Sequence, residues 1–376
     1  MKILLTGGGS GGHFYPLIAI VQEINDLVAE RKLVGPKFYY MSDNPYDEKA
    51  LFEFDIKFIK VRTGKMRLYF SLRNILDIPL TIWGVLVALW KLFFLFPDVV
   101  VGKGGYGSFP AIFAARLLRI PVVIHESDSV PGRVNKFAGK FARRIGIAYE
   151  DAANYFPKDR TALVGIPVRR ELREPRTEGA YEFLKLESGV PIVLVLGGSQ
   201  GAQAINEVIV DILPELLNKY QVIHQVGTAN VDEIKSRLPV VLGNHPHLAR
   251  YKMFGFLSST ALAMSAGAAK LAVTRAGSTF IFEIAGWGLP SIVIPIPESV
   301  SRDQHRNAYN YARTGAAVLI EENNLSTHIL LSEIERVMSS PDIQNSMSEH
   351  ARAFAKPEAG KKMAEAILDL VLSHER

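Results

Sequence analysis

The sequence predicts an α/β protein of two domains, each built on a parallel, doubly wound sheet. Short apolar runs rich in β-branched residues recur along the 376 residues, and each is followed by a turn and a helical pattern. The runs are continuously apolar, which is typical of strands that helices cover on both faces. A charged, polar stretch at Arg169–Gly189 separates two series of runs and is interpreted as an interdomain linker.

The elements follow in order along the chain. The first series has predicted strands within residues 2–8, 37–43, 98–107, 121–127 and 143–150. The second series has them within residues 191–201, 220–227, 269–278 and 290–297. We therefore expect an N-terminal domain over residues 1–167 and a C-terminal domain over 168–350. The last segment, 351–376, contains a helix with no strand after it, which we expect to pack back on the N-terminal domain.

Composition limits the class of partner. The net charge of +5 and a pI near 9.1 favour anionic partners such as nucleotides, phosphates or acidic lipid headgroups. The chain has no cysteine, which excludes disulfides and thiolate chemistry and suits a reducing compartment. The N-terminal apolar stretch is short and lacks a basic flank, so we expect no signal peptide and a cytosolic location.

The chain begins with a strand that runs into a glycine-rich loop, MKILLTGGGSGGH. Gly7-x-Gly9-x-x-Gly12 matches the dinucleotide fingerprint, but that site needs an acidic residue about twenty positions further on. The nearest strand-end acid, Asp43, lies roughly thirty positions past the glycines, which argues against a dehydrogenase. A helix beginning near Phe14 or Pro16 would still make this loop a phosphate site; a tight turn without a ligand is the alternative.

Two similar loops occur in the second domain. In LVLGGSQGAQAIN, Ser199 and Gln200 precede a helix, where Ser199 either binds phosphate or caps the helix. In VTRAGSTFIFEIAGWGLP, the strand is followed by Arg275 and by a helix start, which together would form an anion cradle. Glu283 lies one turn into this helix among apolar neighbours, where its carboxylate could accept both hydroxyls of a ribose. Two such loops in one domain and one in the other suit a sugar-nucleotide enzyme.

Seven motifs, taken in order, resemble the MurG family: GGGSGGHFYP, VVGKGGYGSFPA, IPVVIHESD, VGIPVR, LGGSQGAQAIN, TRAGSTFIFEIAGWGLPSIVIP and DQHRNA. Members of that family transfer N-acetylglucosamine (GlcNAc) to lipid I, giving lipid II for peptidoglycan synthesis. The resemblance implies the GT-B fold, in which two Rossmann-like domains with parallel sheets face a central cleft. It also implies that the C-terminal domain binds UDP-GlcNAc and the N-terminal domain binds the lipid-linked diphosphate acceptor.

The resemblance also implies roles for individual residues. Those expected to bind the donor are Arg169, Ser199, Gln200, Leu257, Gly277, Ser278, Thr279, Glu283, Asp303, Gln304 and Asn307. Those expected to bind the acceptor are Gly9, Ser10, Gly11, Gly12, Tyr106, His125 and Asn135. His13, Glu126 and Asp128 are the candidate catalytic residues.

The motifs depart from the family pattern at three positions. Ser10 replaces a threonine and keeps its hydroxyl. Asp128 replaces a neutral amide, and its charge would need a partner, for which Arg133 is a candidate. Ile166 replaces a polar asparagine. These departures concern the acceptor side more than the donor side.

The implied reaction is a single inverting displacement, in which a base takes the proton of the acceptor hydroxyl as UDP leaves. His13 is the preferred base because imidazole titrates near neutral pH; a hydrogen bond from His13 to phosphate is the alternative role. Glu126 and Asp128 are rival bases. No metal and no cofactor are expected, UDP-GlcNAc being a substrate, and no nucleic acid is expected as a partner. A UDP-GlcNAc 2-epimerase and a non-catalytic sugar-nucleotide-binding protein remain alternatives.

Leu80–Phe96 (LTIWGVLVALWKLFFLF) contains one charge, Lys91, and reaches the short end of transmembrane length. A predicted strand of the same sheet begins at Asp98, so a spanning helix would split the sheet across a bilayer. Basic residues dominate Lys57–Phe96, with Asp77 the single acid: Lys57, Lys60, Arg62, Lys65, Arg67, Arg73 and Lys91. We therefore expect peripheral binding at the cytoplasmic face of an anionic membrane, burial in the core being the alternative.

Overall fold

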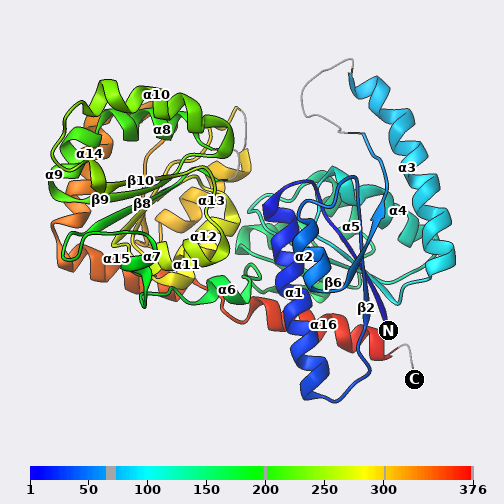
Figure 1. The fold of residues 1–376 in the computed structure, drawn as a ribbon. Helices are drawn as coiled ribbons and strands as arrows, with labels where there is room; N and C mark the ends of the chain where they lie inside the picture. The colour runs from blue at the N-terminus through cyan, green and yellow to red at the C-terminus, as the bar shows by residue number, and fades with distance from the viewer. Residues whose placement is uncertain (65–72, 199–200, 300–301, 374–376) are drawn as a thin grey trace. The chain divides into compact units, whose positions relative to one another are not determined.

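The computed structural model describes residues 1–64, 73–198, 201–299 and 302–373, with side chains except those of 73–76 and 302. The chain forms two compact units. One comprises Met1–Arg169 and Pro357–Arg376, and the other comprises Arg170–Lys356. Each is built on its own parallel sheet (Figure 1).

The first unit contains a seven-stranded parallel sheet in the order β3-β2-β1-β4-β5-β6-β7. Its strands are β1 Lys2–Thr6, β2 Lys37–Ser42, β3 Ile56–Lys60, β4 Val99–Gly102, β5 Val122–Glu126, β6 Arg144–Ile147 and β7 Thr161–Leu163. The five strands expected from sequence are present, and the two edge strands, β3 and β7, are additional. Both edge strands are only partly buried, so neither has the continuous apolarity that identifies a central strand.

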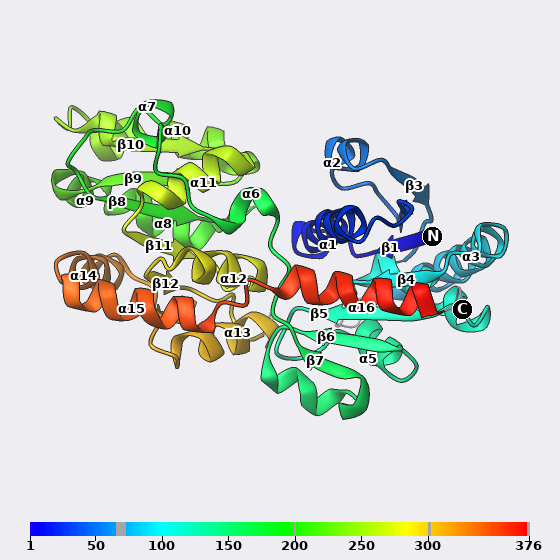
Figure 2. The same ribbon diagram turned by 90° about the horizontal axis from the view of Figure 1, so that it is seen from below.

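Helices cover both faces of this sheet: α1 Gly11–Glu30, α2 Glu48–Glu53, α3 Arg73–Leu95, α4 Phe109–Leu117, α5 Arg133–Gly139 and α16 Ala359–Ser373. Alternate residues of β1 point to opposite faces. Ile3 and Leu5 join the core made with α1 and α16, and Leu4 joins the core made with α3 and α4. Figure 2 shows α16 running alongside the sheet and α1.

The second unit contains a six-stranded parallel sheet in the order β10-β9-β8-β11-β12-β13. Its strands are β8 Ile192–Leu196, β9 Gln221–Gln225, β10 Tyr251–Phe254, β11 Leu271–Thr274, β12 Ser291–Val293 and β13 Ala317–Leu319. The edge strands β10 and β13 were again not expected from the sequence, and both are only partly buried.

The helices of this unit are α6 Arg170–Arg173, α7 Ala180–Phe183, α8 Gln203–Asp211, α9 Leu213–Lys219, α10 Val231–Leu242, α11 Ser259–Ala268, α12 Ser278–Trp287, α13 Arg302–Ala312, α14 Thr327–Met338 and α15 Pro341–Phe354. The predicted linker therefore contains two short helices. It is packed on the unit, since the indole Nε1 of Trp287 donates to the Leu172 carbonyl at 2.6 Å.

The C-terminal segment differs from the single helix predicted from residue 351. Residues 351–354 end α15 in the second unit, and α16 begins at Ala359 in the first. Pro357 lies at the break, where it lacks an N–H and disfavours helical geometry in the residue before it. The chain therefore returns to the first unit at Pro357, and α16 buries Met363, Ile367 and Val371 against it.

Candidate active site

In the first unit, the predicted site residues gather at the carboxyl ends of three neighbouring strands. β4 lies between β1 and β5 in the sheet, and all three are parallel. His13 and Tyr106 lie in the segments that follow β1 and β4, and Glu126 is the last residue of β5. The carboxyl edge of a parallel sheet is where ligands bind in open α/β folds.

Two glycine loops meet there with their backbones in contact. Gly105 has φ +79°, and a Cβ on it would lie 2.7 Å from the Cα of Gly8. Its neighbour Gly104 has φ +84°, and a Cβ there would lie 2.8 Å from the Asn135 side-chain nitrogen. Both positions require glycine, because a side chain would meet backbone or a fixed amide in a conformation that L-residues rarely adopt. The glycines therefore set the spacing of the loops after β1 and β4.

The glycine-rich loop after β1 differs from the prediction at its helix start. α1 begins at Gly11, not near Phe14 or Pro16, because Ser10 adopts the extended conformation of a capping residue (φ −137°, ψ 156°). Gly11 and Gly12 thus belong to the first turn, whose N–H groups lack partners within the helix. This turn offers donors and a positive helix end to an anion.

His13 projects from this turn and is half-buried. Its Nδ1 lies 2.7 Å from Ser10 Oγ. Burial and the Lys103 cation lower the pKa of His13 to about 4, and Asp128 partly opposes this shift. The ring is therefore neutral near pH 7, and the Ser10 contact decides its tautomer. A proton on Nδ1, donated to Ser10, leaves Nε2 as an acceptor suited to a base; the opposite tautomer makes Nε2–H a donor suited to phosphate.

Glu126 ends β5 as a buried carboxyl group. It accepts hydrogen bonds from the Asp128 N–H at 3.0 Å, the Gly132 N–H at 3.2 Å and the Asn135 amide at 2.9 Å. Burial and the neighbouring Asp128 raise the pKa of Glu126 to about 7, against the effect of these donors and of Lys103. Glu126 and Asn135 therefore belong to one hydrogen-bonded group, which leaves Glu126 less accessible to a substrate than His13.

Lys103, which the sequence analysis did not single out, lies in the centre of this group. It follows β4 directly, its N–H donates to the Thr6 carbonyl at 2.9 Å, and its side chain is 1% exposed. Its ammonium group donates to Ser127 Oγ. Burial lowers the pKa of Lys103 to about 8, opposed by the charges of Glu126 and Asp128. Its place in a glycine loop was a signal, but one that would have indicated a phosphate ligand.

Two other predicted acceptor residues, Tyr106 and His125, differ in their surroundings. Tyr106 donates from its hydroxyl to Asp43 at 3.0 Å, and burial raises the pKa of Tyr106 to about 12. His125 is fully buried and its Nε2 donates to the Gly165 carbonyl at 2.7 Å, so it anchors the segment after β7 and does not face a ligand. Ile166 in that segment is buried, which accommodates the loss of a polar side chain there.

Arg169, predicted near the donor phosphates, ends the first unit. Its guanidinium carbon lies 3.7 Å from the centroid of the Tyr15 ring on α1. This stacking fixes the arginine against the same helix that carries His13.

In the second unit, the predicted donor residues gather around the start of α12. Gly277 takes the capping position, and Ser278 and Thr279 form the first turn. Ser278 Oγ accepts a hydrogen bond from the Asn307 amide at 2.8 Å, and both residues are buried. Glu283 is also buried, at 4% exposure, on the next turn. On α13, the Gln304 side-chain oxygen is buried with no hydrogen-bond partner among the described residues, which suits it to accept from a ligand hydroxyl.

One prediction for this unit is corrected. Arg275 is not a free anion ligand, because its guanidinium pairs with Glu322 and lies 3.4 Å from the carbonyls of Ile294 and Pro295. The donor role of Leu257 stays a prediction; its N–H donates to the Gln225 side chain at 3.0 Å. Asp303 is partly buried at the start of α13, and Ser199 and Gln200 lie outside the described residues.

Comparisons with known proteins agree with this architecture. Residues 3–147 match the glycosyltransferase family 28 N-terminal domain, and residues 192–366 match its C-terminal domain. A Listeria welshimeri protein named UDP-N-acetylglucosamine–N-acetylmuramyl-(pentapeptide) pyrophosphoryl-undecaprenol N-acetylglucosamine transferase is 32% identical, covering 99% of this chain and 100% of its own.

Solved structures show the same fold. The crystal structure of Acinetobacter baumannii MurG superposes with a TM-score of 0.71 at 23% identity, covering 98% of this chain and 99% of that one. A putative UDP-N-acetylglucosamine 2-epimerase from Listeria monocytogenes gives 0.69 at 14% identity, covering 100% and 96%. The GT-B fold is thereby confirmed. The sequence relatives then separate transferase from epimerase, and the chain belongs to the MurG family of glycosyltransferases.

Proposed function

We propose that this glycosyltransferase moves GlcNAc from UDP-GlcNAc to lipid I, the undecaprenyl-diphosphate-linked MurNAc-peptide, and so makes lipid II. The observation that carries the proposal is the match, over 99% of the chain, to a relative named for this reaction. The geometry is compatible with it, since each unit carries a candidate anion site beside a parallel sheet. We assign the acceptor to the first unit and the donor to the second.

On the donor side, the first turn of α12 provides N–H groups for the diphosphate, with the Ser278 hydroxyl held by Asn307. Glu283 lies one turn further on and would accept the ribose hydroxyls. The Gln304 side-chain oxygen is buried without a hydrogen-bond partner among the described residues, and a sugar hydroxyl would satisfy it.

In the transfer step, the acceptor sugar oxygen forms a bond to C1 of GlcNAc while the bond from C1 to the UDP oxygen breaks. His13 receives the hydroxyl proton at Nε2, with its Nδ1–H donated to Ser10. The departing diphosphate gains negative charge, which a helix N-terminus and Arg169 would stabilise. Glu126 is the less suitable base because three donors already occupy its carboxyl oxygens.

Incubation with UDP-GlcNAc and a lipid I analogue tests the function directly. We expect a β-linked disaccharide on the lipid and one equivalent of UDP. Formation of ManNAc without an acceptor would identify a 2-epimerase, and binding of UDP-GlcNAc without any product would identify a non-catalytic binding protein.

We predict that Glu283→Ala weakens UDP binding. The ribose hydroxyls would lose their buried acceptor, at a cost of about 1–3 kcal/mol. Isothermal titration with UDP measures this, with Glu215→Ala, at an exposed site of the same unit, as the control. An unchanged affinity in a folded Glu283→Ala variant would remove Glu283 from the donor site.

We predict that the acid limb of kcat/KM for the acceptor lies well below pH 6. The lowered pKa of His13, about 4, means that its base form exists at every pH above that value. Glu126, with its raised pKa of about 7, would act as a base only above neutrality. Measured initial rates between about pH 5 and 9 should therefore be flat on the acid side, because kcat/KM reports the free enzyme. A limb near pH 7 would assign the base to Glu126.

The variant His13→Gln tests the same base role by removing the imidazole. We expect kcat to fall by about 10²–10⁴-fold with UDP affinity unchanged, since the donor is assigned to the other unit. Wild-type turnover in this variant would exclude the base role.

We further propose that α3 docks on an anionic membrane surface. Asp77–Leu95 is long and apolar enough to cross a bilayer, with a mean hydropathy of 2.0, yet only 17% of it is buried. It connects β3 and β4, which belong to one sheet, so it cannot span. Its exposed large residues are Ile78, Leu80, Ile82, Trp83, Leu86, Trp90, Phe93 and Phe94, with Phe96 directly after it.

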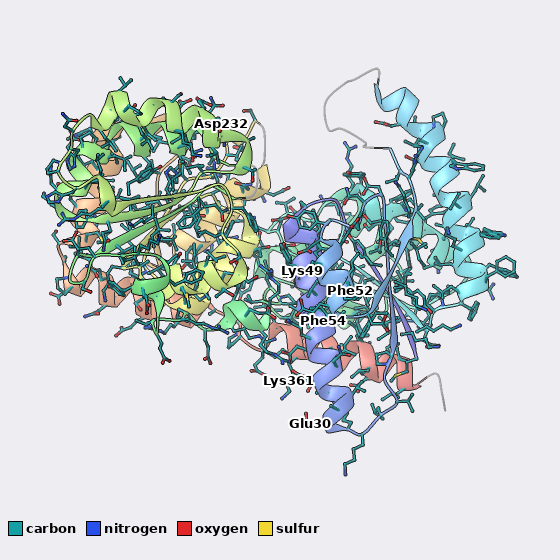
Figure 3. The ribbon with its side chains drawn as sticks, viewed as in Figure 1. Glu30, Lys49, Phe52, Phe54, Asp232 and Lys361 are labelled. Atoms are coloured by element: carbon teal, nitrogen blue, oxygen red, sulfur yellow. The ribbon has the colours of Figure 1, made fainter. Side chains whose placement is uncertain are left out.

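The position and charge of α3 suit a lipid headgroup layer. Figure 3 shows its side chains extending away from the sheet. Exposed Lys57, Lys60 and Arg62 precede it in the chain, whereas Lys65 and Arg67 lie outside the described residues and the Arg73 side chain is not described. Tryptophan favours the interface, and each basic group near an anionic leaflet is worth about 1 kcal/mol.

We predict that co-sedimentation with liposomes requires anionic lipid and weakens as salt is added. Trp83→Ser together with Trp90→Ser should abolish it. Phe52→Ser is the control, because Phe52 is 89% exposed on α2, outside the proposed surface (Figure 3). Equal sedimentation of both variants would mean that α3 does not dock.

A further inference from the structure

A buried lysine in the acceptor unit is used by none of the steps above. Lys103 is 1% exposed, so its ammonium group cannot reach a bound diphosphate in the way of a phosphate-loop lysine. It donates instead to Ser127, between the two acidic residues of the turn Glu126–Ser127–Asp128. A charge removed from water to this extent needs an opposite charge nearby.

We propose that Lys103 is a positioning residue of the reaction, whose buried ammonium is the fixed counter-cation for the Glu126–Ser127–Asp128 turn, in a loop against which the His13 ring packs: a Cβ on Gly105 would lie 3.5 Å from His13 Cε1. The proposal rests on the proposed role of His13 as the base. Two contacts fix the position of Lys103. The Lys103 N–H pairs with Thr6 of β1, and its side chain binds the turn after β5.

The titratable groups that interact with Lys103 come from two elements. His13 belongs to α1, and His125, Glu126 and Asp128 belong to β5 and the turn after it. The cation lowers the pKa of both histidines, and the two carboxylates raise that of Lys103. Near pH 7 the group thus carries its positive charge on Lys103 and leaves the half-buried His13 ring unprotonated.

The test is Lys103→Met, which keeps an unbranched side chain one atom shorter than lysine and removes the charge. Histidine titration in the free protein, followed by NMR and assigned to His13 with a His13→Gln variant, should show the pKa of His13 moving from about 4 towards the ordinary value of about 6.5. The acid limb of kcat/KM for the acceptor should move up by the same shift. Lys49→Met, an exposed site on α2 (Figure 3), should leave both unchanged.

A second variant keeps the test decisive if Lys103→Met unfolds. Lys103→Met with Asp128→Asn removes one charge of each sign, so its urea midpoint should recover towards wild type. If it does not recover, Lys103 is not a counter-cation. UDP affinity should stay at the wild-type level in every folded variant.

Two results would overturn the proposal. An unshifted His13 titration in folded Lys103→Met, with turnover reduced at all pH values, would make Lys103 a packing residue. A rise confined to the acceptor KM would make it a ligand of the acceptor. The titration needs no substrate, so it remains informative even if the wild-type protein forms no disaccharide.

Discussion

The close approach of the Gly8 and Gly105 backbones is the constraint on which the acceptor-side arrangement depends. Strands β1 and β4 are neighbours in the sheet, but side chains on the loops that follow them would push those loops apart. Without side chains at these two positions, the first turn of α1 lies against the segment that carries Lys103. The ionisable groups from the two strands then fall within each other's electrostatic range. A glycine-rich loop therefore serves here to bring two parts of the protein together as well as to admit a phosphate.

The two units place charge differently. In the first, burial lowers the pKa of Lys103 and raises that of Glu126, and the charges of their neighbours act on both. In the second, the residues near the start of α12 include the neutral Ser278–Asn307 pair, and Arg275 is neutralised by Glu322. Proton transfer requires a tuned pKa, whereas recognition of a nucleotide requires directional donors and acceptors. The difference matches the assignment of acceptor activation to the first unit and donor binding to the second.

Much of the fold could be predicted from the sequence because central parallel strands are buried on both faces and read as apolar runs. The edge strands were missed for the same reason: β3 (IKFIK) has lysine at two of its five positions, and only Ile56 is buried. The site was harder to predict. The motifs that resemble the MurG family indicated His13, Glu126 and Glu283 as candidates, but they could not show that Arg275 is paired within its own unit. Lys103 in a glycine loop would have indicated a phosphate ligand, whereas its burial against Ser127 favours a role inside the protein.

The arrangement of side chains on α3 is the reverse of that in a core helix. Its inward face carries Gly84 and Ala88 beside one large residue, Leu92, and a Cβ on Gly84 would lie 2.2 Å from the Arg62 carbonyl. Small residues let the helix lie close against the unit. Its large residues, such as Trp83 and Trp90, are more than half exposed. A core helix buries its largest apolar groups, since burial scales with apolar area. A helix that exposes them gains that energy only from another apolar phase, and a lipid-linked substrate provides the reason for the protein to meet one.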